Sequence, residues 1–148
     1  MNRIAVLCSA VCCIFCIGYG SDAVSASGTF VQRKVLKDVD VTLTSSGTWL
    51  FEQGRRFVWN TLKPMPSVFT ATPTNYSFAA GGRTTVRPLK MKIENVSQIF
   101  EIKEMRVFVE RVETADADPA YSSGGIVIPS SLTVFFRNGD RLEISLKR

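Results

Sequence analysis

Residues 48–60 have the sequence TWLFEQGRRFVWN, and this stretch decides the fold. Two apolar runs flank a short polar segment with a glycine at its centre, which is typical of a β-hairpin with a three-residue loop. Pairing residues whose numbers sum to 108 places Trp49 opposite Trp59, Phe51 opposite Phe57, and Glu52 opposite Arg56. Two pairs are then aromatic and one joins opposite charges. The sequence therefore predicts a loop at residues 53–55 and four aromatic side chains on one face.

The segment before this hairpin also favours strands. Phe30–Leu36 and Val39–Thr44 are rich in β-branched residues and are joined at Lys37-Asp38. Ser45-Ser46-Gly47 then interrupts the second strand before it resumes at Thr48, which indicates a bend at this point.

A second hairpin is predicted near the C-terminus. Pairing residues whose numbers sum to 278 places Leu132 opposite Leu146, Val134 opposite Ile144, and Phe136 opposite Leu142. The loop is then Asn138-Gly139-Asp140. A two-residue Asn138-Gly139 turn is the alternative, but it sets Phe136 opposite the charged Arg141. We therefore expect the three-residue loop.

The region between the hairpins is less regular. Its apolar positions Met91, Val96, Ile99 and Phe100 fall on a helical stripe, which predicts a helix over residues 92–101, although Ile93 and Ile102 suit a strand equally well. Residues 105–113 predict a further strand. Residues 114–125, rich in Asp, Ala, Ser and Gly, predict a surface loop. The expected class is mainly antiparallel β with one or a few short helices.

The first 26 residues have the pattern of a signal peptide. Arg3 is followed by the apolar run Ile4–Ile17, which is too short to cross a bilayer comfortably. Small residues then predict cleavage near Ala23 or Ala26. The chain of 148 residues thus divides into a leader, 1–26, and one exported domain, 27–148.

The predicted domain is poor in reactive side chains. All four cysteines lie in the leader, at Cys8, Cys12, Cys13 and Cys16, so the domain has no thiol, disulfide or cysteine ligand. The chain has no histidine, which removes the usual general base, the usual partner of a nucleophilic serine and the commonest nitrogen ligand for metals. We expect neither an enzyme nor a cofactor or metal site.

Charged residues suggest two other chemistries. Acidic residues cluster in two places, Glu101 with Glu104, and Glu113 with Asp116 and Asp118. Such clusters can serve acid-base catalysis or bind calcium, but solvated surface acids are the simpler interpretation. Removing one basic and one acidic residue with the leader leaves 17 basic against 12 acidic residues, a net charge of +5. These cations are scattered, and Arg56 has a cross-strand partner in Glu52, so we expect no nucleic-acid binding.

A set of spaced residues resembles a known family. It comprises Phe30 and Gln32 as Phe-x-Gln, Gly47 before the second strand, Phe57 and Trp59 as aromatic-x-Trp, Pro64 five residues later, and then Val68 and Phe69. Over residues 28–72 the chain is similar to the N-terminal half of LolA-like outer-membrane lipoprotein carriers. The resemblance implies a half-open, incomplete antiparallel β-barrel, with helices that cover an apolar concavity.

The resemblance also implies a function. Such a protein is periplasmic, holds the acyl chains of a lipoprotein or lipid in its groove and moves them between envelope membranes, with inner- and outer-membrane proteins as possible partners. The candidate groove residues are aromatic: Phe30, Trp49, Phe51, Phe57, Trp59 and Phe69. Gln53 and Arg55 are candidates for a rim that meets a partner.

The chain departs from the family pattern at two places, which are this rim and the helices that cover the concavity. Gln53 and Gly54 stand where well-known carriers have an arginine followed by a proline, a site linked there to receptor-driven release of cargo. The predicted leader also runs almost directly into Phe30, which leaves little room for the family's N-terminal helix.

Two other functions fit the same residues. One is an envelope sensor or regulatory module on the same half-barrel, which would signal to a membrane partner. The other is a structural or adhesive β-domain whose aromatic face is filled core. The identity of the cargo and the oligomeric state are left open.

Overall fold

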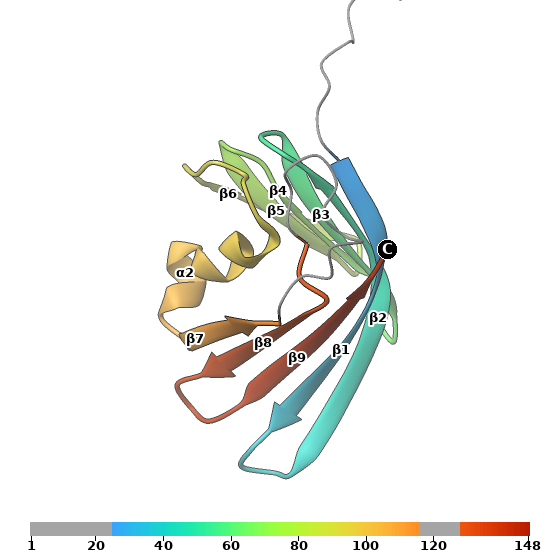
Figure 1. Cartoon of the computed structure of the whole chain (residues 1–148), viewed down its shortest axis with the longest axis vertical. Coiled ribbons are helices and arrows are strands. Elements are labelled where there is room, and N and C mark those ends of the chain that lie inside the picture. The colour runs from blue at the N-terminus through green and yellow to red at the C-terminus, as the bar shows by residue number, and fades with distance from the viewer. Residues whose placement is uncertain (1–24, 116–127) are drawn as a thin grey trace, which may run out of the picture.

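The computed structural model describes residues 25–115 and 128–148. They form one antiparallel sheet of nine strands in the order β6-β5-β4-β3-β2-β1-β9-β8-β7, which curls but does not close (Figure 1). The strands are β1 (Ser25–Leu36), β2 (Val41–Glu52), β3 (Arg56–Lys63), β4 (Ser67–Ala71), β5 (Asn75–Ala80), β6 (Arg83–Pro88), β7 (Val109–Thr114), β8 (Ser131–Phe136) and β9 (Arg141–Lys147). The expected mainly β class with an open antiparallel sheet is confirmed.

The aromatic hairpin has the predicted register. Trp49 pairs with Trp59, Phe51 with Phe57 and Glu52 with Arg56, and Gly54 supplies the positive φ of 74° in the loop. The preceding turn is longer than expected: it spans residues 37–40, so the second strand begins at Val41 and not at Val39.

The predicted bend at Gly47 is a register shift within one continuous strand. Ser46 pairs with Lys63 and Gly47 with Thr61, so Leu62 is the extra residue on β3. A Cβ atom on Gly47 would lie 1.9 Å from the backbone oxygen of Asn60. Gly28 is equally crowded, since its Cβ would lie 1.8 Å from the backbone oxygen of Lys147. The two glycines let neighbouring strands approach this closely in the curled sheet.

The predicted register of the C-terminal hairpin is wrong by two residues. Leu132 pairs with Ile144, and Val134 with Leu142. The loop is closed one residue earlier than expected, because the Phe136 amide donates to the Asp140 carbonyl at 3.0 Å. The Asp140 amide in turn donates to Asn138 Oδ1 at 2.9 Å. A shift of two residues keeps the side chains on the same faces, so the apolar partners still meet.

The hairpin of β5 and β6 was not predicted from the sequence. β5 and β6 are joined by Gly81 and Gly82, whose φ values of 57° and 75° are those of a type I′ turn. A Gly-Gly pair between β-prone runs is the signal that indicates this hairpin.

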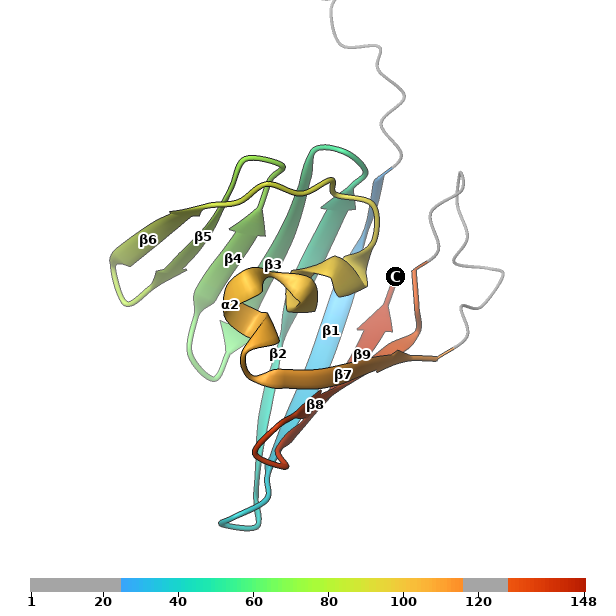
Figure 2. The same ribbon diagram turned by 90° about the vertical axis from the view of Figure 1, so that its left-hand side faces the viewer.

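Two short helical elements follow β6. They are η1 (Val96–Glu101), a 3₁₀ helix, and α2 (Lys103–Arg106). The helix predicted over 92–101 thus begins four residues late, because Asn95 caps it: its side chain accepts from the Gln98 amide. The strand predicted over 105–113 begins only at Val109. In Figure 2 both helical elements lie in front of the sheet, over its concave side.

Some predictions fall outside the described residues. Residues 1–24 of the predicted signal peptide lie there, whereas Ser25 and Ala26, the last two residues of that prediction, are in β1. Residues 116–125 of the predicted surface loop lie there too, whereas Thr114 ends β7. Within the described residues, no helix has the length and apolar character needed to span a membrane.

Candidate functional site

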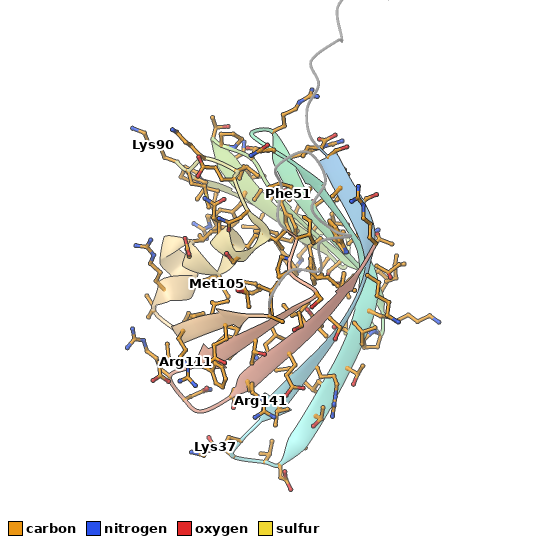
Figure 3. All side chains as sticks on the ribbon, in the orientation of Figure 1. Lys37, Phe51, Lys90, Met105, Arg111 and Arg141 are labelled. Atoms are coloured by element: carbon orange, nitrogen blue, oxygen red, sulfur yellow. The ribbon has the colours of Figure 1, made fainter. Side chains whose placement is uncertain are left out.

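The concave face of the sheet is apolar. Side chains alternate along each strand, so that in β1 Phe30 is buried while its neighbour Val31 is 45% exposed. The buried set comes from strands on both halves of the sheet and from the helical region: Ala26, Phe30, Trp49, Phe51, Phe57, Ala71, Ile93, Val96, Ile128, Leu132, Ile144 and Leu146. In Figure 3, Phe51 lies among the side chains that fill the inside of the curl.

The strand register brings the six candidate groove residues onto this face. Across neighbouring strands, Phe30 pairs with Gly47, Trp49 with Trp59, Phe51 with Phe57, and Trp59 with Phe69. Four of the six are almost fully enclosed: Phe30, Trp49, Phe51 and Phe57 are at most 2% exposed. Trp59 and Phe69 are only partly buried.

Ring contacts hold these aromatics in place. Phe30 stacks on Trp59 with ring centroids 3.8 Å apart, and Phe57 lies 5.8 Å from Trp59. Trp49 is fixed differently, because its indole Nε1 donates to the backbone oxygen of Thr29 at 3.1 Å. Trp59 is therefore the centre of the aromatic cluster, and Trp49 is tied to the backbone of β1.

A cavity of about 100 Å³ that is partly open to solvent borders this cluster, and we call it the interior cavity. Its walls are formed by Gln32, Trp59, Phe69, Val96, Ile99, Phe100, Leu132, Leu142 and Ile144. The side chains of these lining residues are aliphatic or aromatic except that of Gln32. For comparison, an apolar protein cavity of about 150 Å³ holds a molecule of the size of benzene. The cavity can accept a small apolar group as it stands, but not a long acyl chain.

A short segment forms the roof of the cavity. We call residues 89–108, which include η1 and α2, the cover segment. Ile93, Val96 and Ile102 of this segment are buried, and Ile99 and Phe100 pack against the core. Helices of six and four residues are not stable alone, so this packing holds them in place. None of these residues was a site candidate from the sequence, although the helical stripe of Val96, Ile99 and Phe100 was the signal that could have indicated them.

Backbone hydrogen bonds attach the cover segment near its two ends. The Leu89 amide donates to Thr74 at 3.0 Å, and the Gly54 amide donates to Ile93 at 2.7 Å. At the other end the Arg137 amide donates to Phe108 at 2.8 Å. Between these points, the amides of Gln98, Ile102, Met105 and Arg106 donate to carbonyls of the segment itself. The middle of the segment is thus held to the sheet by side chains.

The two candidate rim residues lie away from the cavity. Gln53 and Arg55 are exposed in the turn between β2 and β3, beside the Gly54 amide that holds Ile93. The predicted pair of Glu52 and Arg56 at the base of this turn is confirmed as an ion pair.

Among the residues that the structure describes, no three His, Cys, Asp or Glu side chains lie close enough together to hold a metal ion. No protein-family model matches the chain, and no curated protein matches it either. The assignment of a function therefore depends on the geometry of the concave face.

Proposed function

We propose that this protein is a LolA-like periplasmic carrier that binds the acyl chains of a lipoprotein or lipid between the concave face and the cover segment. The observation that carries the proposal is the apolar cavity between Trp59 and Phe69 on the sheet and Ile99 and Phe100 on the cover segment. An open sheet with an apolar hollow under a short helical cover is the architecture that the resemblance implies.

The residues that carry the resemblance support the proposal by their positions. Gly47 lies at the register shift between β2 and β3, and Trp59 and Phe69 line the cavity. Pro64 follows β3 in the turn that leads to β4. The residues of this pattern therefore lie at the register shift, in the turn after β3 and along the apolar lining of the cavity.

Hydrophobic burial supplies enough free energy for such a carrier. Each methylene that leaves water for an apolar site contributes ~0.8 kcal/mol, so an acyl chain needs no charged or catalytic group to be held. Because the cavity is small, a long chain requires the middle of the cover segment to move away from the sheet. The internal hydrogen bonds of η1 and α2 allow this movement without breaking the sheet.

A structural β-domain with a filled core is the second candidate. The specific observation in its favour is that Phe30, Phe51 and Phe57 are at most 1% exposed beneath the cover segment. In such a domain the cover segment is a permanent part of the core and no acyl chain enters.

The two tryptophans provide an experiment that separates these candidates. In Trp49→Phe the remaining emission comes from Trp59 at the cavity, and in Trp59→Phe it comes from Trp49. The purified variants are titrated with stearic acid brominated at mid-chain, because bromine quenches an indole that it contacts. A carrier shows saturable quenching that is strong for Trp59 and weak for Trp49.

Unbrominated stearic acid is the control for changes in fluorescence that binding itself causes. Absence of quenching in both variants, at concentrations where dispersed lipid is in excess, would contradict the carrier and favour the filled core.

A further inference from the structure

A second hollow lies at the end of the sheet that carries the β8–β9 turn. We call it the rim hollow; it has a volume of about 360 Å³ and is lined by Lys34, Met105, Val107, Phe108, Phe136, Arg137, Asn138 and Asp140. None of these residues was a candidate from the sequence. Figure 3 shows Met105 on the inner side of the cover segment.

Nearby positions on the same elements line the interior cavity and the rim hollow. On β1, Gln32 lines the cavity and Lys34, the next residue on the same face, lines the rim hollow. On β8, Leu132 lines the cavity and Phe136 lines the rim hollow. On the cover segment, Phe100 lines the cavity and Met105 lines the rim hollow. The two spaces are therefore consecutive along the inside of the curl.

The rim hollow combines apolar surface with positive charge. Val107 and Phe108 are 65% and 63% exposed, so this end of the cover segment presents uncovered apolar side chains. Lys34 Nζ lies 5.3 Å from the centroid of the Phe136 ring. Among the ion pairs of residues 25–115 and 128–148, none involves Lys34 or Arg137.

The carboxylate in the hollow already has partners. Asp140 Oδ1 accepts from the backbone amide of Lys37 at 3.0 Å, and its Oδ2 accepts from Asn138 Nδ2 at 3.0 Å. Two cations thus face one anion in the lining. A ligand that extends from the interior cavity into this hollow meets an environment that favours negative charge.

We propose that the rim hollow binds the anionic headgroup of an amphiphile whose acyl chain occupies the interior cavity, with Lys34 as the main charged contact. The inference rests on the proposed function and narrows its cargo to amphiphiles with a carboxylate or phosphate headgroup. A neutral diacylglyceryl group lacks the charge that Lys34 and Arg137 complement.

The Trp59 emission of Trp49→Phe provides the test. This variant is titrated with brominated stearic acid and with its methyl ester, above neutral pH and below the concentration at which either aggregates. The acid is expected to bind about fivefold more tightly than the ester, which is the scale of one partly exposed ion pair. Adding Lys34→Gln removes this preference, and Lys34→Glu reverses it.

Lys147→Gln is the matched control. Lys147 is an exposed lysine at the end of β9, outside the rim hollow, and its loss removes the same charge. The preference for the acid is expected to persist in this variant. Brominated phosphatidic acid and brominated diacylglycerol, compared in the same way, distinguish a phosphate from a carboxylate headgroup.

The outcomes separate the two proposals. Equal quenching by acid and ester, unchanged by Lys34→Gln, would overturn the headgroup site and leave the carrier in place. Quenching by neither compound would overturn the carrier itself, and the headgroup site with it.

Discussion

At the scale of single residues, Gly47 allows β2 and β3 to approach closely at the register shift. Because a Cβ atom there would overlap the backbone of Asn60, the strands must separate to admit one. We expect Gly47→Ala to lower the free energy of unfolding by about 1–3 kcal/mol, the usual cost of overpacking. Chemical denaturation measures the change.

Thr48→Ala is the control for this substitution. Thr48 is the next residue on β2 and is exposed, so its truncation is expected to change the free energy of unfolding by no more than about 0.5 kcal/mol. Equal effects of the two substitutions would contradict the steric role of Gly47.

Much of the residue-level pattern was predictable, and the reason is local. Around Gly54 one register is specified, because an odd shift places Trp49 and Trp59 on opposite faces and an even shift separates Glu52 from Arg56. At the C-terminal hairpin, alternation specifies the face but not the register. Hydrogen bonds of Asn138 and Asp140 within the loop decided the register there, and alternation carries no information about them.

At the scale of elements, the cover segment depends on its N-terminal cap. Asn95 Oδ1 accepts from the Gln98 amide at 3.2 Å, and Gln98 Oε1 accepts from the Asn95 amide at 2.9 Å. We expect Asn95→Ala to lower the free energy of unfolding by about 1 kcal/mol. If the cover segment moves to admit acyl chains, the same variant takes up brominated stearic acid faster in stopped-flow fluorescence.

Glu94→Ala provides the comparison for this variant. Glu94 is exposed and adjacent, and its backbone amide, which donates to Gln98, is retained. Its stability and uptake rate should match those of the unchanged protein. Slower uptake in Asn95→Ala would contradict a cover that opens.

The elements were less predictable than the residue pairs. Periodicity indicated a helix near Val96, but the cap at Asn95 set its start and the 3₁₀ geometry limited its length. Residues 105–106 were predicted as the start of a strand, and yet they belong to α2. Their conformation depends on the position of the cover segment over the sheet, which is a tertiary effect.

At the scale of the whole molecule, the open curl produces the candidate site. β6 and β7 are the two edges of the sheet, and the cover segment lies between them (Figures 1 and 2). The β class and the aromatic face followed from alternation along the sequence. The interior cavity and the rim hollow did not, because their walls combine residues as distant as Gln32 and Ile144, or Lys34 and Asp140.

Native mass spectrometry of the protein purified from the cells that naturally produce it, followed by lipid extraction, tests the proposed carrier function most directly. A carrier is expected to show an added mass that corresponds to one acyl-bearing molecule per chain, and extraction should release that molecule. A mass that remains that of the polypeptide alone, even after incubation with lipid and lipoprotein, would contradict the carrier and identify the concave face as a filled core.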